Sequence, residues 1–379
     1  MNRHVACMIL WGVAACDCER SAGPEAGESA TDPNDVAWGD IADHFGVAVP
    51  EPGSAPRFDP PAEQEVVDVE PSTSTLAEQP YDHILPGDPL LLVRTELLGA
   101  AQDYGARDTL VAFENGEERA VREWDTMFHC FERADPFVYA GGSESLVRVD
   151  LRDGSQRTLF EGRVLALALS DDHIFWATGG PARAGEGPGA LHRMPRDGGR
   201  AELLYSGMPF VLELLVHRDR LYWIGKRRPR RVMDQPPGYL VSAPLSGGDP
   251  TTEVFASQRP TGLAIDNDAI YLLTEGTLGH SLNDSFNDGY VLRRAHGTNR
   301  WRALAHEQPM PSRLVVEESQ LCWVASGNTR AHLRCVANTG GPVAELPQPS
   351  GIPVLAMDDG ELYVSDRRGT STLPLSDLP

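Results

Sequence analysis

The chain of 379 residues carries a formal net charge of −22 at pH 7, with 55 acidic residues against 33 lysines and arginines. This length suits one large β domain or two average ones, and the acidity disfavours a nucleic-acid partner, which requires a basic surface. No long apolar stretch follows the N-terminal region, so we expect no transmembrane helix.

The N-terminal residues have the pattern of an export signal. Arg3 precedes an apolar run at 5–15, which is too short for a membrane-spanning helix but suits the core of a signal peptide. The run leads into VAAC at 13–16, which resembles the bacterial lipobox. The resemblance implies that residues 1–15 are a signal peptide and that lipidated Cys16 anchors the exported protein in the bacterial cell envelope. A conventional secretory signal cleaved at another bond is the alternative.

Residues 17–80 have the composition of an acidic tether. They contain 15 acidic residues and only two arginines, and they are rich in Pro, Ser, Gly and Ala. Such a segment buries too little apolar surface to offset its chain entropy. The sequence therefore predicts a disordered acidic linker at 16–61 and a folded domain at 62–379. An acidic tail that binds a partner is the alternative interpretation.

A short hydrophobic and aromatic phrase recurs along the folded region. Its copies are DDHIFWAT at 171–178, HRDRLYWIGK at 217–226, DNDAIYLLTE at 266–275, EESQLCWVAS at 317–326 and DDGELYVSDR at 358–367. Each copy follows an aliphatic run and precedes an alternating segment and a glycine turn. Four short alternating segments, repeated about every 40 to 50 residues, are the signature of antiparallel propeller blades. The sequence therefore predicts an all-β protein with a single β-propeller.

The tryptophans of these phrases occupy one repeated position. Trp176, Trp223 and Trp323 all stand on the second strand of their units. In a propeller this strand packs against the neighbouring blade, so we expect the three side chains to lie in the core. Exposure for stacking on a ligand is the alternative.

The number of glycine turns predicts the number of blades. Turns between third and fourth strands are expected at Gly116, Gly154, Gly198, Gly247, Gly297 and Gly340. A seventh unit begins at Gly351 and has only three strand-like segments. We therefore expect seven four-stranded blades, with the missing strand supplied from the N-terminal side by residues 65–69, which would protect the sheet edges. Six blades, with 81–125 as an extension, is the alternative.

The repeated phrase supports a family resemblance. The LYW in the copy at 217–226 resembles the YWTD-type propellers of lipoprotein-receptor ectodomains, and LYVSDRRG at 362–369 is similar to NHL-type blades. No copy reads YWTD in full, and only Ser365-Asp366 approaches its last two positions. The resemblance implies the propeller fold and leaves the partner open.

Two of the six cysteines are placed to form a disulfide. Cys322 and Cys335 lie on the second and third strands of one unit, and a hairpin loop at 327–330 would set them directly opposite each other. Opposite residues have Cβ atoms about 4.5–5.5 Å apart, close enough for a bridge. Two buried thiols are the alternative. Cys18 and Cys130 have no evident partner in the sequence.

Three consecutive units carry long connections between their second and third strands, at 179–189, 226–238 and 275–289. Such loops emerge on one face of a propeller, and insertions confined to one face often mark the binding side. The middle loop gathers five basic residues that suit a carboxylate or phosphate partner. They are Lys226, Arg227, Arg228, Arg230 and Arg231. A plain solvated loop, or a dock for the acidic tether, is the alternative.

The third loop holds oxygen donors that suit calcium, although no glutamate follows at the position that an EF-hand requires. They are Asn283, Asp284, Asn287 and Asp288. Calcium is thus a candidate ligand, and no other cofactor is expected.

Catalytic motifs are not evident. The nearest approach to a nucleophile elbow, GHSLN at 279–283, lacks its final glycine and its strand–turn–helix setting. We therefore expect a non-catalytic recognition or scaffold module that binds an envelope protein, an extracellular protein or an anionic glycan. A metal-dependent, lactonase-like propeller hydrolase with its site at the central channel is the alternative.

Overall fold

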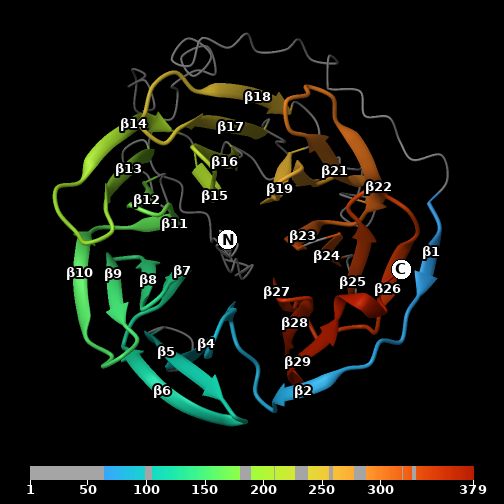
Figure 1. Ribbon diagram of the computed structural model, residues 1–379, viewed down its shortest axis with the longest axis horizontal. Helices are drawn as coiled ribbons and strands as arrows, with labels where there is room; N and C mark the ends of the chain where they lie inside the picture. Colours follow the sequence, from blue (N-terminus) through green and yellow to red (C-terminus); the bar gives the residue numbers. More distant parts are fainter. Residues whose placement is uncertain are drawn as a thin grey trace, which may run out of the picture.

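The computed structural model describes residues 64–98, 105–179, 189–208, 210–226, 238–255, 259–276, 287–317, 319–326 and 330–379. Seven β-sheets surround a common axis in these residues (Figure 1). The predicted all-β propeller with seven blades is confirmed, and the six-bladed alternative is wrong. The predicted signal peptide, Cys16 and the tether lie outside the described residues.

Blades one to six are built from four consecutive strands each. The strands of the first three blades are β3 (His83–Leu85), β4 (Leu90–Leu98), β5 (Gly105–Glu114) and β6 (Glu117–Trp124); β7 (Phe128–Ala134), β8 (Phe137–Gly142), β9 (Ser145–Asp150) and β10 (Gln156–Glu161); and β11 (Val164–Leu169), β12 (His173–Thr178), β13 (Gly189–Pro195) and β14 (Glu202–Met208). The strands of the next three are β15 (Phe210–His217), β16 (Arg220–Lys226), β17 (Gly238–Pro244) and β18 (Thr251–Phe255); β19 (Pro260–Ile265), β20 (Ala269–Thr274), β21 (Gly289–Ala295) and β22 (Arg302–Gln308); and β23 (Pro311–Glu317), β24 (Gln320–Ser326), β25 (Ala331–Ala337) and β26 (Val343–Leu346).

The seventh blade joins the two ends of the described chain. It contains β27 (Val354–Asp358), β28 (Glu361–Asp366) and β29 (Gly369–Pro374), with β2 (Ser74–Ala77) as its outer strand; β1 (Val66–Asp68) and the 3-10 helix η3 (Leu375–Asp377) complete the elements. The first strand of every blade lies nearest the axis and the fourth lies at the circumference (Figure 1).

Ring closure confirms one expectation and corrects another. The strand that completes the last blade does come from the N-terminal side, but it is β2, which pairs antiparallel with β29. Residues 65–69, predicted to close the ring, instead contain β1, which pairs parallel with β26 as a fifth strand of the sixth blade. Alternation in 65–69 indicates a strand but does not select its partner. The small, polar STLA of β2 lacks the alternation that would reveal it.

The antiparallel path gives the propeller two distinct faces. Turns between first and second strands, and between third and fourth strands, lie at one face, here called the turn face. Connections between second and third strands, and between successive blades, lie at the opposite face, here called the loop face. The three long loops therefore begin and end at the loop face.

The core lies between neighbouring blades, as predicted for the tryptophans. Trp176, Trp223 and Trp323 are each 0% exposed. Trp223 of the fourth blade packs in one cluster with Ala166 and Phe175 of the third. Each inter-blade space therefore has its own apolar core, and the prediction that these rings are structural is confirmed.

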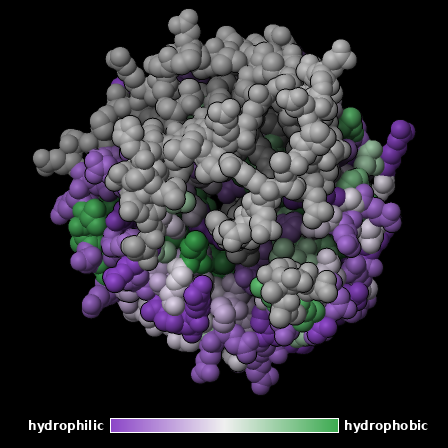
Figure 2. Space-filling model, turned by 180° about the vertical axis from the view of Figure 1, so that it is seen from behind, coloured by the Kyte–Doolittle hydropathy of each residue, from purple (hydrophilic) through white to green (hydrophobic). Residues whose placement is uncertain are grey.

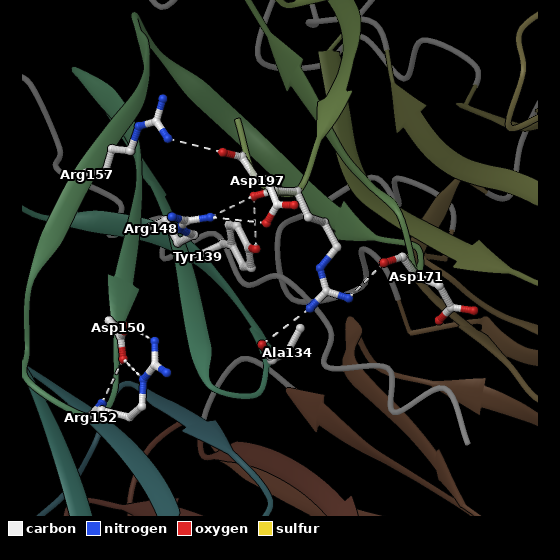
Figure 3. A network of polar contacts seen from close by, with 9 residues as sticks. Ala134, Tyr139, Arg148, Asp150, Arg152, Arg157, Asp171 and Asp197 are labelled. Carbon is white, nitrogen blue, oxygen red and sulfur yellow. Dashed lines mark hydrogen bonds and ion pairs between the residues drawn. The ribbon is translucent and has the colours of Figure 1, made fainter. Parts of the chain in front are cut away.

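Arginines join the blades at the turn face. Figure 3 shows Arg157 of β10 reaching the turn of the next blade, where it donates a hydrogen bond of 3.1 Å to the backbone oxygen of Asp197. In the same manner Arg193 donates to the backbone oxygen of Leu245 at 2.6 Å, and Arg302 to that of Thr339 at 3.2 Å. These bonds give backbone carbonyls of the turns a donor from the preceding blade.

The predicted disulfide is present. Cys322 of β24 and Cys335 of β25 stand opposite each other in the ladder, with their Cα atoms 4.1 Å apart, and their sulfur atoms are bonded. Cys130 is a buried free thiol in the second blade. In the described part of the chain, no helix has both the length and the apolar character needed to cross a bilayer.

Candidate functional site

The innermost strands share an irregularity near their first residues. In five blades the register of the first strand against the second breaks there. The breaks lie between Phe128 and Cys130, Val164 and Ala166, Val211 and Glu213, Pro260 and Gly262, and Ser312 and Val315. A bulge of this kind re-aims a side chain and often lies next to a functional site.

These breaks lie at the loop face. The first residues of the inner strands pair with the last residues of the second strands, as Val164 does with Thr178 and Pro260 with Thr274. The connections between second and third strands leave from those same ends. The bulged positions therefore lie beside the bases of the long loops.

Six polar side chains from the starts of the inner strands form what we call the axial cluster. Its members are Asp82, His83, His129, Arg163, Glu213 and Arg313, which come from five blades. Their charges act on one another: Arg313 affects the titration of both His83 and Glu213, and Arg163 that of His129. The cluster is therefore a single electrostatic unit.

Glu213 is an enclosed acid. Its Oε2 accepts a hydrogen bond of 2.5 Å from the backbone N–H of Leu263, in the neighbouring blade. Burial raises the pKa of Glu213 to about 8, against the lowering effects of this bond and of Arg313. At neutral pH the side chain is therefore mainly protonated, so it has a proton to donate.

Arg313 has a strained backbone conformation, and the charges of Glu213 and Asp82 act on its side chain. Its backbone φ is 61°, in the left-handed region that non-glycine residues rarely adopt. Burial lowers the pKa of the Arg313 guanidinium, while the charges of Glu213 and Asp82 act in the opposite direction. Asp82 is fixed in turn, since its Oδ2 accepts a hydrogen bond of 2.7 Å from the Thr95 N–H.

Both histidines of the cluster are held neutral. The His83 side chain is buried against Phe131, with ring centroids 4.7 Å apart. Burial lowers the pKa of His83 to about 3, and the charges of Arg313 and His129 add to this effect. Burial also lowers the pKa of His129, and the positive charge of Arg163 lowers it further.

A serine lies beside one of these histidines. The Nε2 of His129 is 3.0 Å from the Oγ of Ser143. A serine nucleophile requires its histidine to accept a proton and form an imidazolium. Burial and then the Arg163 charge lower the pKa of His129, so both disfavour the imidazolium form.

The candidate metal ligands are only partly described. Asn283 and Asp284 lie outside the described residues, while Asn287 and Asp288 directly precede β21. Among residues that the structure describes, no three or more His, Cys, Asp or Glu side chains gather in a way that would hold a metal ion. Calcium binding by the third loop stays a prediction.

The structure describes the strand ends on either side of the arginine loop, but the loop itself lies outside the described residues. Lys226 is the last residue of β16 and pairs with Gly238, the first residue of β17, so the loop begins and ends at the loop face. Arg227, Arg228, Arg230 and Arg231 lie outside the described residues. Their role in binding stays a prediction.

The axial cluster was not found from the sequence. Its members are separated by up to about 230 positions, and each is a single polar residue in or beside an aliphatic run. The available signal was the glutamate inside the run LELLV at 212–216, where a strand core should be apolar. Only closure of the ring brings such residues together.

Comparison with solved structures supports the fold. The tricorn protease matches with a TM-score of 0.59 and 12% identity, over 84% of this chain and 35% of that one. The extracellular domain of BT4673 from B. thetaiotaomicron matches with a TM-score of 0.53 and 13% identity, over 82% and 40% of the two chains. The N-terminal domain of S. cerevisiae Nup159 matches with a TM-score of 0.50 and 10% identity, over 84% and 99%.

These similarities establish the β-propeller fold and no shared activity. This chain spans well under half of the tricorn protease chain and of the BT4673 chain. No protein-family model matches the sequence. No curated protein matches it either.

Proposed function

We propose that this protein is an exported, lipid-anchored recognition module whose loop face binds an envelope protein, an extracellular protein or an anionic glycan. The axial cluster is the observation that supports this most directly. Placing charged and polar groups in buried or partly buried positions costs folding free energy, and so does left-handed backbone at Arg313. A ring needed only for structure would fill these inner positions with apolar side chains.

The chemistry of the cluster favours recognition over catalysis. It presents guanidinium donors, a protonated carboxyl group and neutral imidazoles, which together can donate and accept several hydrogen bonds. Burial and the Arg163 charge disfavour the imidazolium that His129 would form in activating Ser143. Binding through fixed polar groups needs no such activation, so the arrangement suits a ligand with polar or anionic groups.

The described surface also favours a polar partner. Figure 2 shows mainly hydrophilic residues on the coloured part of the side of the molecule that it presents, with hydrophobic residues in small separate groups. The large hydrophobic side chains that are exposed in the described residues come from distant elements. They are Val66, Leu97, Leu203, Met310 and Ile352. Scattered apolar residues are ordinary and do not form a hydrophobic interface.

The proposal of export and of a membrane anchor is supported by sequence motifs alone. The VAAC at 13–16 supports lipidation at Cys16, and the acidic composition of 17–80 supports a tether between membrane and propeller. Mass spectrometry of the protein purified from membranes tests this. A diacylglyceryl group on Cys16, lost in Cys16→Ser, is the expected result; an unmodified mature chain that starts at another residue would exclude the anchor.

Capture of partners from a native envelope extract tests the recognition role. The full chain serves as bait beside three variants: Glu213→Gln, Arg163→Gln, and a loop variant with the five basic residues of 226–231 changed to Ser. Arg152→Gln is the matched control, since Arg152 is an exposed turn-face arginine that pairs with Asp150, the last residue of the preceding strand β9.

The capture results distinguish the possible binding sites from one another and from the hydrolase alternative. A partner kept by the control and lost by either axial variant places binding at the axial cluster. Loss by the loop variant alone moves the site to the arginine loop within the same function. Retention by all variants excludes the loop face, and no capture together with copurified metal favours the hydrolase alternative.

A further inference from the structure

The axial cluster contains a buried polar side chain whose hydrogen-bonding atoms are unused. His83 is only 6% exposed, and its ring packs beside Phe131. No group among the described residues makes a hydrogen bond to either ring nitrogen of His83, and neither nitrogen is fully enclosed. A neutral imidazole has one donor and one acceptor, and buried polar groups in proteins normally have partners. His83 therefore has unmet hydrogen-bonding capacity at the loop face.

Glu213 offers a second unused polar atom of the same cluster. Its Oε2 accepts the hydrogen bond from the Leu263 N–H, whereas its Oε1 makes no hydrogen bond within the part of the chain that the structure describes. Burial raises the pKa of Glu213 to about 8, so the carboxyl group is mainly protonated at neutral pH. Because Oε2 already accepts a bond, the proton belongs on Oε1. Glu213 is therefore a donor that has no acceptor.

Arg313 brings positive charge to both of these groups. Its charge acts on the titration of His83 in the first blade and of Glu213 in the fourth. These two blades lie on opposite sides of the ring (Figure 1). A side chain that influences both must reach towards the axis. The unused donors of His83 and Glu213 therefore share one region with a guanidinium charge.

The mixture of donors and acceptors selects among anionic ligands. A carboxylate suits the Arg313 charge and the Glu213 proton, while hydroxyl groups suit the His83 nitrogens and the Asp82 carboxylate, which can accept as well as neutralise. A phosphate dianion would bring two negative charges close to Asp82. An acidic protein side chain would satisfy the donors but has no hydroxyl group for the acceptors. The cluster therefore favours a ligand that carries one carboxylate beside several hydroxyls.

We propose that the axial cluster binds a uronate, the sugar acid of an anionic glycan. Its carboxylate would lie against Arg313 and the Glu213 carboxyl group, and its ring hydroxyls would bond with His83 and Asp82. A single uronate supplies the anion and the hydroxyls in the small space that one sugar ring occupies. This inference rests on the proposed recognition function and names the ligand class of the same site.

Titration calorimetry of the full chain with galacturonate, glucuronate and their trisaccharides tests the proposal. At least one of these should bind saturably. Galactose or glucose, which lacks the carboxylate, should bind at least tenfold more weakly than its uronate. A capped peptide with one glutamate, which lacks the hydroxyls, should also bind at least tenfold more weakly.

Two variants place the ligand at the axial cluster. Arg313→Gly and Glu213→Leu should each weaken uronate binding at least tenfold. Glycine accepts the left-handed backbone at 313, and leucine is close to glutamate in size but has no proton to donate. Arg152→Gln, at the turn face, is the control and should bind normally. An unchanged thermal midpoint in each variant shows that a loss of binding is not a loss of fold.

The pH profile of the unaltered protein gives a second readout that a purely structural role for Glu213 would not produce. Uronate affinity should fall above about pH 8, because Glu213 then ionises and repels the ligand carboxylate. The uronate itself stays ionised throughout, since carboxylic acids lose their proton near pH 4. An affinity that does not change between about pH 6 and 9 would contradict contact between Glu213 and the ligand.

Three calorimetric results would overturn the proposal. They are no saturable binding of any uronate up to about 10 mM, binding that survives both variants, and peptide binding as tight as uronate binding. Uronate added to the capture experiment distinguishes this inference from the proposed function. A partner that depends on the axial cluster but is not displaced by uronate overturns the ligand class alone, and the recognition function stands. Displacement of that partner supports both.

Discussion

At the scale of single residues, enclosure near the axis sets the protonation of several side chains. Glu213 keeps its proton to about pH 8 because burial raises its pKa, and His83 stays neutral because burial lowers its pKa. Glu132 of β7 is also buried, and burial raises its pKa well above the usual value. These acids make folding depend on pH, because an unfolded glutamate loses its proton near pH 4.5.

The contribution of Glu213 to stability should therefore fall as pH rises from about 5 to 8, and above about pH 6.5, where an unfolded histidine is already neutral, the opposing effect of His83 no longer changes with pH. In this window the unfolded chain has already lost the Glu213 proton and the folded chain still holds it, so each rise in pH favours the unfolded state. Above about pH 8 this contribution levels off. Urea unfolding at several pH values should give a shallower slope for Glu213→Gln than for the wild type. Glu96→Gln, at an exposed glutamate, should keep the wild-type slope; equal slopes in all three proteins would contradict the prediction.

The disulfide is the second residue-scale determinant. It bridges 13 positions between Cys322 and Cys335, inside one hairpin and fully buried. A crosslink over a loop of this size contributes about 2–4 kcal/mol by restricting the unfolded chain. The double variant Cys322→Ala/Cys335→Ala should lose roughly this amount in equilibrium urea unfolding without reductant. An unchanged free energy of unfolding would show that the bond adds no stability.

At the scale of elements, stability depends on how each blade is joined to the next. Apolar side chains pack in each inter-blade space, and at the turn face arginines donate hydrogen bonds to backbone oxygens in the turns of a neighbouring blade. Arg133 of β7 is the most enclosed example, with its side chain 6% exposed. It donates to the backbone oxygens of Asp88 at 2.9 Å and Pro89 at 2.5 Å, in the first blade.

Replacing Arg133 by lysine should weaken the contact between the first two blades. Lysine keeps the charge but lacks the planar fork, so it leaves at least one of these two carbonyls without its arginine donor. We expect a loss of about 1–3 kcal/mol in the free energy of unfolding. Arg152→Lys, at an exposed turn arginine that bonds to Asp150 two residues away in the same blade, should leave stability unchanged. If both variants behave alike, the inter-blade bonds of Arg133 contribute nothing specific.

At the scale of the whole molecule, the ring is closed by pairing between residues about 300 positions apart. Ser74 pairs with Thr372 in the last blade, and Val66 pairs with Val343 in the sixth. A side chain adds to this N-terminal pairing, since the Gln64 Oε1 accepts a hydrogen bond of 2.8 Å from the His306 backbone N–H. Without β2, the outer edge of β29 would be an open template for aggregation.

Two truncations test the closure. A chain that starts at residue 64 keeps both N-terminal strands and should unfold thermally at the same midpoint as the full protein. A chain that starts at residue 79 loses both strands, so it should unfold at a lower temperature and associate through the exposed edge. Size-exclusion chromatography beside thermal unfolding measures both effects. A monomeric 79–379 chain with the full midpoint would show that the ring does not need this closure.

The sequence alone determined the features that depend on residues close together in the chain. The strand–turn repeat indicated the propeller, six glycine turns and a shortened last unit indicated seven blades, and hairpin register placed Cys322 opposite Cys335. Period-two alternation, turn glycines and pairing across a short loop are local properties, so each can be recognised inside one repeat.

Only the tertiary structure decided which N-terminal strand closes the ring and which polar side chains meet. The partner of β2 lies at the other end of the chain, and the axial cluster takes its members from five blades. Bulges at the inner strands shift the side-chain alternation by one position, so the faces of Glu213 and Arg313 do not follow from the pattern. Long-range pairing and bulges depend on the closed ring as a whole, and the linear sequence does not display them.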